Sequence, residues 1–217
     1  LKGVVMKAHY NGLIPRNPFI QFHISPNVKE REYLTEDELK AVMTHEFADS
    51  KLAYIRDIFI FASFTALSFV DIQELTNDNI VEVNGEKWIL SKRHKTKVAF
   101  QVKLLDIPLQ IVERYRPMQK DNRIFPGLNY WSICKPLKRM IRECGITKSI
   151  SFHCSRHGFA TLALSKGMPI ESVSRVLGHT NIVTTQLYAK ITTQKLDNDL
   201  TMFGDKLSKT FNGITMS

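Results

Sequence analysis

Lys51–Leu67 reads KLAYIRDIFIFASFTAL and is strongly apolar over several helical turns. A helix that is apolar on most of its circumference is buried on all sides, so we expect this one at the centre of the core. The segment before it, Thr35–Phe47 (TEDELKAVMTHEF), opens with Thr35 and Glu38 at the spacing of a capping box. A second helix is predicted there, with one apolar face made of Leu39, Val42, Met43 and Phe47.

The periodicity changes between Asn79 and Leu104, where the chain reads NIVEVNGEKWILSKRHKTKVAFQVKL. Runs rich in β-branched residues are interrupted by Asn84-Gly85, a dipeptide strongly favoured in tight hairpin turns. We expect three antiparallel strands, with the second turn formed by KRHKTK at Lys92–Lys97.

Helical patterns return after this sheet. The predicted helices are Pro108–Arg116, Tyr130–Cys144, His153–Lys166, Pro169–Leu177 and Thr180–Ile191. A last amphipathic segment, TTQKLDNDLTMFGDKL, carries Leu196, Leu200 and Phe203 on one stripe, which would dock on its own domain or on a neighbouring molecule. The expected fold class is mainly α with a small three-stranded antiparallel β-sheet.

The N-terminal part of the chain is predicted to be the last segment of a preceding domain. Pro15, Pro18 and Pro26 exclude regular structure in the stretch around them, which is typical of a linker. We expect residues 1–28 to form the end of a preceding domain with its linker, residues 29–205 the main domain, and residues 206–217 a tail. Because the chain starts at Leu1 without an initiator Met, we expect a fragment of a longer protein.

The charge balance favours a polyanionic partner. Thirty Lys and Arg stand against 21 Asp and Glu, a formal net charge of +9, and the basic residues cluster in SKRHKTK and CKPLKRMIREC. Clustered positive charge indicates DNA or RNA binding. The three cysteines, Cys134, Cys144 and Cys154, have no CxxC spacing and suggest a reducing compartment. With no apolar run long enough for a membrane span and no signal-peptide pattern, a cytoplasmic location is expected.

SFHCSRHGFATLAL, Ser151–Leu164, brings three basic side chains to one helical face. His153, Arg156 and His157 lie at i, i+3 and i+4, so their positive charges would repel one another unless the face meets an anion, a carboxylate or a metal. The His spacing allows metal ligation, but no HExxH glutamate lies between the two histidines. The planar fork of Arg156 suits a phosphate better.

LGHTNIVTTQLYAKI, Leu177–Ile191, places Tyr188 nine residues after His179. Taken alone, this stretch has an ordinary interpretation. Thr180 would cap a helix with an apolar stripe of Ile182, Val183 and Leu187, and Tyr188 would be one more core residue.

Together the motifs HCSRH, LGHT and TTQLY resemble those of the tyrosine recombinase (phage integrase) family, whose signature is HxxR, then LGH, then a nucleophilic tyrosine nine residues later. FTALSFVDIQEL is similar to the TGLRxxEL box of that family, and the KRHKTK turn also corresponds, so the resemblance extends from about Lys29 to the C-terminus. The NPF of the linker and FVDIQELT look like integrases of Bacteroidetes mobile elements. The resemblance implies a catalytic domain preceded by the tail of a DNA-clamping, core-binding domain.

The resemblance also implies a mechanism and roles for individual residues. Tyr188 would attack a DNA phosphodiester to give a 3′-phosphotyrosyl link and a free 5′-hydroxyl, with no metal or cofactor. His153 would act as the base, and Arg156 and His179 would hold the nonbridging oxygens. His157 would support the phosphate or a neighbouring residue of the active site.

The acid for the leaving 5′-oxygen would be a lysine of the hairpin turn. Lys95 is the first choice and Lys92 and Lys97 are its rivals. Alternatively Lys92, Arg93 and Lys97 contact backbone phosphates at a solvated hairpin tip without taking part in chemistry.

One position departs from the family pattern. Ser68 follows TAL, where the first catalytic arginine of the family is expected. Arg56, on the preceding apolar helix, is predicted as a substitute because an arginine among apolar residues needs an anionic partner. The alternative is an ion pair of Arg56 with Asp57, Asp71 or Glu74.

The implied partners are double-stranded DNA attachment sites, three further copies of the chain in a homotetramer on DNA, and accessory DNA-bending proteins, with a nucleoid-associated location. In isolation the chain is expected to be a monomer. Two other functions remain open at this level. MPIESVSRVLGHTNIVTTQLY also has the pattern of a helix-turn-helix, which would suit a noncatalytic DNA-binding regulator. A type IB topoisomerase would use the same covalent intermediate to relax DNA.

Overall fold

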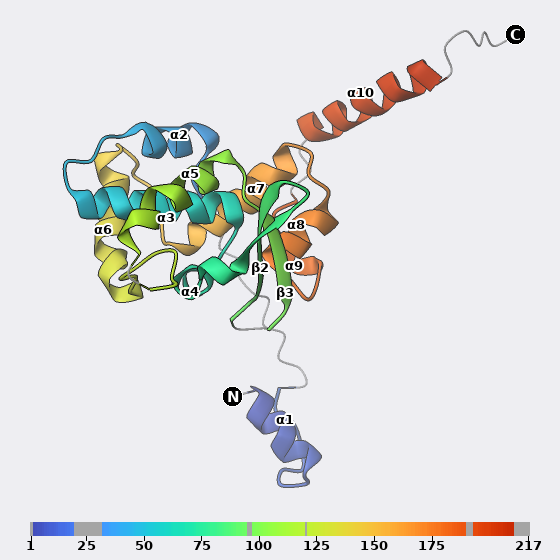
Figure 1. Cartoon of the computed structure of the whole chain (residues 1–217). Helices are drawn as coiled ribbons and strands as arrows, with labels where there is room; N and C mark the ends of the chain where they lie inside the picture. The colour runs from blue at the N-terminus through green and yellow to red at the C-terminus, as the bar shows by residue number, and fades with distance from the viewer. Residues whose placement is uncertain (1, 20–31, 95–96, 120, 190–192, 211–217) are drawn as a thin grey trace, which may run out of the picture. The chain divides into compact units, whose positions relative to one another are not determined.

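The computed structural model describes residues 2–19, 32–94, 97–119, 121–189 and 193–210. The chain divides into two compact units, Leu1–Glu30 and Arg31–Ser217. The first unit contains helix α1 (Lys2–Tyr10). All further elements belong to the second unit and are labelled in Figure 1 where space allows.

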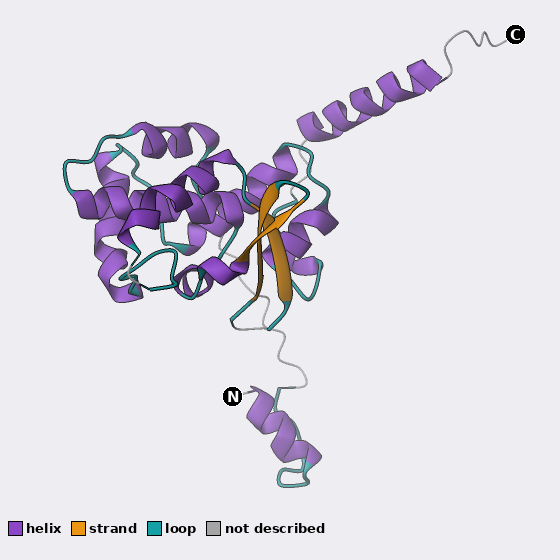
Figure 2. Cartoon of the chain, in the orientation of Figure 1, coloured by secondary structure: helices purple, strands orange, loops and turns teal. Residues whose placement is uncertain are grey.

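The second unit is built mainly of helices with one small sheet (Figure 2), so the predicted fold class is confirmed. Two short 3₁₀ turns, Asn77–Asn79 and Arg116–Met118, complete the regular structure of the described residues. The helices are α2 (Glu36–Thr44), α3 (Ser50–Thr65), α4 (Phe69–Gln73), α5 (Asp106–Tyr115), α6 (Tyr130–Glu143), α7 (His153–Ser165), α8 (Ile170–Leu177), α9 (Val183–Gln186) and α10 (Thr193–Thr210). Among these described helices, none is long and apolar enough to cross a bilayer.

Helix α3 is the central element, as its apolar sequence predicts. It packs against α2, α5, α6 and α7, and most of its side chains are buried. The capping box before α2 is present: Thr35 Oγ1 accepts from the Glu38 amide at 3.3 Å, and the Thr35 amide donates to Glu38 Oε2 at 2.7 Å. At the other end of α3, Ala66 adopts a left-handed conformation (φ 56°), so the chain turns sharply toward α4.

The sheet has the strand order β1-β2-β3, with β1 (Ile80–Val83), β2 (Glu86–Lys92) and β3 (Ala99–Lys103), all antiparallel. Asn84 (φ 52°) and Gly85 (φ 76°) make the predicted tight turn between β1 and β2. Ile89 on β2 faces Val102 on β3, and both are buried against the helices. The register fixes the start of the second hairpin, where Lys92 pairs with Ala99.

A small apolar cluster, separate from the main core, joins the C-terminal helices. It consists of the buried residues Ala66, Ala160, Leu164, Val173 and Leu177, and the partly buried Tyr188 packs against it. Helices α7 and α8 and the turn after α3 therefore meet close to the tyrosine.

The predicted helix Thr180–Ile191 is wrong in most of its length. Helix α9 spans only Val183–Gln186, and Asn181 Oδ1, rather than the Thr180 side chain, accepts the Val183 amide at 2.9 Å. Ile182, Val183 and Leu187 are exposed and form no core stripe. The sequence pattern misled because three apolar residues at helical spacing do not show which of them meet a partner.

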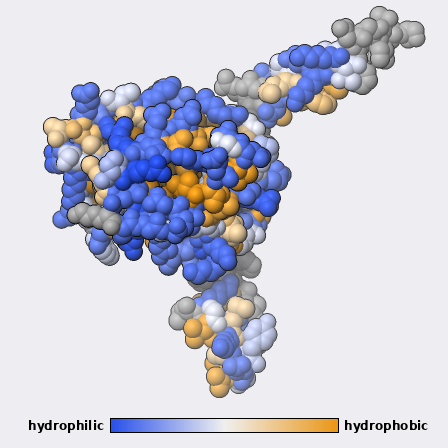
Figure 3. Space-filling model, in the orientation of Figure 1, coloured by the Kyte–Doolittle hydropathy of each residue, from blue (hydrophilic) through white to orange (hydrophobic). Residues whose placement is uncertain are grey.

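Helix α10 is amphipathic, as predicted, and continues to Thr210. Leu196, Leu200 and Phe203 are between 50% and 59% exposed. In Figure 3 pale orange apolar residues lie beside blue hydrophilic ones on this helix. The apolar stripe therefore has little burial within the chain.

Candidate functional site

Helix α7 carries His153, Arg156 and His157 on one face, as their spacing predicts. Arg156 is buried, with 9% of its surface exposed. Its Nη1 donates to the carbonyl of Ala66 at 2.7 Å, and its Nη2 donates to the carbonyl of Leu177. Both carbonyls lie at helix ends, where backbone acceptors lack an intrahelical partner. The Arg156 guanidinium, which comes from α7, thus connects the C-terminal ends of α3 and α8.

Arg93 is the site residue that the sequence interpretation placed incorrectly at a solvated hairpin tip. It is only 5% exposed and follows β2 directly. Its Nη1 donates to Asp71 Oδ2 at 2.7 Å, its Nη2 donates to the Val176 carbonyl at 2.5 Å, and its guanidinium lies over the Phe100 ring at 4.0 Å. Its Nε is buried and has no hydrogen-bond partner among the described residues.

A signal for Arg93 was present in the sequence. Side chains alternate between the two faces of a strand, so residues 89, 91 and 93 share one face. Ile89 on that face is fully buried, whereas Lys92 on the other face is exposed. Continuing the alternation of β2 by one step would have assigned Arg93 to the inner face.

Ser68 and Arg93 meet at one carboxylate. Asp71 Oδ2 accepts from Ser68 Oγ at 2.7 Å as well as from Arg93. Asp71 Oδ1 accepts the amide of His94 at 3.0 Å. The Arg93 guanidinium therefore lies beside the position where the family pattern has its first arginine.

Burial and these contacts shift the pKa values of Asp71 and of the arginines in the site. Burial raises the pKa of Asp71, but the hydrogen bonds from His94, Ser68 and Arg93 outweigh it and leave that pKa below its usual value. Burial and the positive charge of Arg93 lower the pKa of Arg156 to about 10, so the Arg156 guanidinium remains charged at neutral pH. Burial also lowers the pKa of Arg93, and the hydrogen bond and negative charge of Asp71 act against this shift.

Arg56 is not part of this cluster, and its predicted role as the substitute arginine is not supported. Its Nε donates to Asp57 Oδ1 at 2.9 Å and its Nη1 to the His45 carbonyl at 2.8 Å. The ion-pair alternative therefore describes it. Arg56 lies ten positions before Ala66, which is about 15 Å along a helix.

Gly178 links the LGH turn to Arg93. It ends α8 with φ +61°, a conformation that favours glycine. A Cβ at this position would lie 2.9 Å from Arg93 Nε and 3.0 Å from its Cγ. Glycine is thus needed twice, for the turn and for the space that Arg93 fills.

His179 follows this glycine and joins the site. Its Nδ1 lies 2.8 Å from Thr185 Oγ1. Burial, together with the charges of Arg156, Arg93 and His153, lowers the pKa of His179 to about 4. The imidazole is therefore neutral at physiological pH.

The ring of His157 lies between the rings of His153 and Tyr188 and contacts both. The centroids of His153 and His157 are 4.6 Å apart with the rings nearly perpendicular, and those of His157 and Tyr188 are 5.2 Å apart. An ionised Tyr188 phenol is close enough to Arg156 to raise the pKa of its guanidinium. The structure thus brings together the predicted site residues His153, Arg156, His157, His179 and Tyr188.

The hairpin lysines are only partly described. Lys95 lies outside the described residues. Lys92 and Lys97 are exposed, and the Lys97 amide donates to the Arg93 carbonyl at 2.8 Å, which closes the turn. Within the described ranges, no group of three His, Cys, Asp or Glu side chains is arranged to hold a metal ion.

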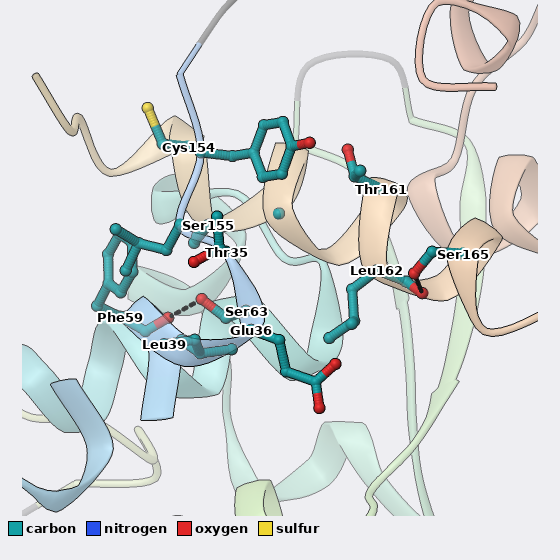
Figure 4. Close-up of a pocket in the computed structure, with 13 residues that line it drawn as sticks. Thr35, Glu36, Leu39, Phe59, Ser63, Cys154, Ser155, Thr161, Leu162 and Ser165 are labelled. Carbon is teal, nitrogen blue, oxygen red and sulfur yellow. Dashed lines mark hydrogen bonds between the residues drawn. The ribbon is translucent and has the colours of Figure 1, made fainter. Parts of the chain in front are cut away.

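A cavity of about 250 Å³ lies on the other face of α7, between α2 and α3 (Figure 4). Residues such as Cys154, Thr161 and Leu162 line it, and the hydrogen bond from Ser63 to the Phe59 carbonyl lies at its wall. None of the five clustered site residues contributes to the lining, so this cavity is separate from the site.

Comparisons with known proteins agree with this geometry. The phage integrase family matches residues 32–195. The chain is 32% identical over 177 residues to the tyrosine recombinase XerA of Pyrococcus horikoshii, covering 75% of this chain and 58% of XerA. It is 26% identical over 204 residues to the tyrosine recombinase XerD of Listeria innocua, covering 86% of this chain and 67% of XerD. The chain thus spans 58% to 67% of the length of these relatives.

Solved structures share the fold. The integrase of transposon Tn1549, in complex with a circular intermediate DNA, matches with a TM-score of 0.77 at 17% identity, over 93% of this chain and 76% of that one. The XerH site-specific recombinase, bound to a palindromic difH substrate, matches with a TM-score of 0.67 at 22% identity, over 84% and 56%. The family match covers most of the chain and includes the HxxR, LGH and tyrosine positions, so the chain belongs to the phage integrase family.

Proposed function

We propose that this chain is the catalytic part of a site-specific DNA recombinase that cuts and rejoins DNA through a 3′-phosphotyrosyl intermediate. The observation that carries the proposal is the arrangement of two buried guanidiniums, Arg93 and Arg156, with His179 and the Tyr188 ring at one place. Among the described residues Asp71 is the one carboxylate that pairs with these two guanidiniums, which leaves positive charge for a phosphodiester.

The first step is an in-line attack by Tyr188 Oη on the phosphorus. The P–O5′ bond breaks as the P–O(Tyr) bond forms, so the energy of the phosphodiester is retained for rejoining. A phenol has a pKa near 10 and needs a base as it attacks; His153 takes this proton. His157, in ring contact with both residues, supports the tyrosine in its place.

Charge that develops on the nonbridging oxygens is met by Arg156, Arg93 and His179. Arg93 supplies the guanidinium that the family pattern expects at Ser68, because both share Asp71 Oδ2. Its Nε is buried beside Gly178 and has no hydrogen-bond partner among the described residues. Arg156 is held rigidly by two carbonyls, so the site needs little rearrangement on binding.

Departure of the 5′-oxygen requires a proton. Lys95 supplies it in this proposal, on the strength of its place in the hairpin turn, with Lys92 and Lys97 as the alternatives. The exposed lysines that do not supply the proton bind backbone phosphates.

The partners in this proposal are double-stranded attachment sites and three further copies of the chain, with accessory DNA-bending proteins. XerH and the Tn1549 integrase were solved with DNA, which supports the first of these. The regulator hypothesis rested on the helix-turn-helix pattern of residues 168–188, and the second helix of that stretch, α9, spans only Val183–Gln186.

The test is covalent capture on a nicked suicide substrate. The protein is incubated with candidate attachment-site DNA, and adducts are separated on a denaturing gel. We expect an adduct with the wild type and none with Tyr188→Phe. DNA that is bound without an adduct would favour the noncatalytic regulator. Exchanged strands, formed only with a pair of sites, would separate a recombinase from a topoisomerase.

A further inference from the structure

Thr185 is a fully buried polar residue to which the proposed chemistry gives no role. It lies on α9 with 0% of its surface exposed, whereas its neighbour Thr184 is exposed. The Tyr188 amide donates to the Thr185 carbonyl at 3.0 Å, so Thr185 is also the residue from which the turn toward the tyrosine starts.

The hydroxyl of Thr185 has an unusual partner. Buried Ser63 and Thr65 on α3 donate to carbonyls four residues earlier, Phe59 at 2.9 Å and Phe61 at 2.7 Å, which is common for hydroxyls in helices. Thr185 Oγ1 instead lies 2.8 Å from His179 Nδ1, and this is its one hydrogen bond among the described residues.

The direction of this bond follows from the groups available. A hydroxyl has one proton to donate, and a buried donor without an acceptor costs free energy. If His179 Nδ1 carried the proton, the hydroxyl would accept and its own proton would have no acceptor. The hydroxyl therefore donates to Nδ1, and the single proton of the neutral ring is on Nε2.

We propose that Thr185 is a positioning residue that holds His179 as the neutral tautomer protonated on Nε2, so that its one N–H is directed away from Thr185 to a phosphoryl oxygen. The last part rests on the proposed function. Because the pKa of His179 is lowered to about 4, the ring has only one N–H at neutral pH, and the tautomer decides whether it is offered to the phosphate.

The tautomer is measured directly by two-bond proton–nitrogen NMR of the histidine rings in the 15N-labelled chain at pH 7. The His179 signals are assigned with His179→Gln. We expect Nε2 protonated and Nδ1 as a hydrogen-bonded acceptor in the wild type and in Thr185→Ser. In Thr185→Val the Nδ1 signal should move to that of an acceptor without a donor. A wild-type ring protonated on Nδ1 would overturn the proposal.

The effect of Thr185 on the rate of DNA cleavage is measured with the suicide substrate. Thr185→Val has nearly the same volume but no hydroxyl, and we expect cleavage about 10- to 100-fold slower at unchanged DNA affinity. Thr185→Ser should restore most of the rate, and the matched exposed variant Thr184→Val should cleave like the wild type. Thr185→Val cleaving at the wild-type rate would overturn the positioning role. If the wild type forms no adduct, the proposed function fails, and the NMR experiment still decides the tautomer.

Discussion

At the scale of single residues, the site is explained by what each buried charge touches. Arg93 and Asp71 are a buried ion pair at 2.7 Å, with side chains 6% and 5% exposed. Removing one member of such a pair leaves an unpaired buried charge, at a cost of about 3–5 kcal/mol in many proteins. Ser68 belongs to the same unit because it donates to the same oxygen. Ser68 and Arg93 therefore belong to one hydrogen-bonded unit around Asp71.

This unit leads to a prediction in which the charge is kept. Arg93→Lys preserves the pairing with Asp71 but lacks the planar fork, and we expect cleavage about 10²- to 10³-fold slower, as for the loss of one oxyanion donor. The double variant Ser68→Arg/Arg93→Ser returns the guanidinium to the family position and should recover much of this loss. Rates come from single-turnover cleavage of the suicide substrate.

The matched control for Arg93 is the exposed neighbour Lys92. Because Lys95 supplies the proton in the proposal, Lys92→Ala should lower DNA affinity and reduce the salt dependence of binding by the share of about one phosphate, with little effect on cleavage at saturating DNA. A large loss of cleavage at saturating DNA would instead make Lys92 the acid. Equal cleavage by Arg93→Lys and the wild type would exclude Arg93 from the reaction.

At the scale of elements, local patterns predicted most of the secondary structure. The capping box at Thr35, the Asn84-Gly85 turn and the helix carrying His153 are determined by residues close in sequence, so they could be inferred without tertiary information. The segment after Gly178 could not, because the contacts of Thr185 with His179 and of Tyr188 with His157 replace helical continuity there. The alternation of β2 indicates the burial of Arg93, but its partner could not be inferred, because Asp71 is 22 residues earlier in the chain.

The turn between α8 and His179 gives a prediction for glycine. Gly178→Ala meets both a positive φ and the Arg93 side chain, whereas Gly145→Ala meets a positive φ of +74° with nothing within 4 Å. Each variant should lose about 1–2 kcal/mol of folding free energy from the left-handed conformation. Only Gly178→Ala should also lose cleavage activity, because it displaces Arg93.

Chemical denaturation gives the stability of both glycine variants, and the suicide substrate gives their cleavage rates. If Gly145→Ala and Gly178→Ala lose activity equally, the effect is one of general stability, and the packing of Arg93 on the LGH turn has no catalytic consequence.

At the scale of the whole molecule, helix α10 carries an apolar stripe that has little burial within the described part of the chain. Leu196, Leu200 and Phe203 follow one another at intervals of four and three residues, so they lie on one side of the helix. All three are at least half exposed. A stripe of this kind is stabilised by docking, on the same chain or on a second copy, and the two cases differ in what a substitution would do.

The triple variant Leu196→Ser/Leu200→Ser/Phe203→Ser distinguishes these cases. If α10 docks on another copy, the isolated chain should keep its unfolding midpoint, because these side chains contribute little burial within it. A single DNA site should still be cleaved, since the Arg93, Arg156 and Tyr188 cluster is unchanged. Assembly of several protomers on paired sites, measured by light scattering of the protein–DNA complex, should be reduced. A marked fall of the unfolding midpoint in the isolated chain would instead assign the stripe to docking on its own domain, because only then would the substitutions remove apolar contacts before any partner is present.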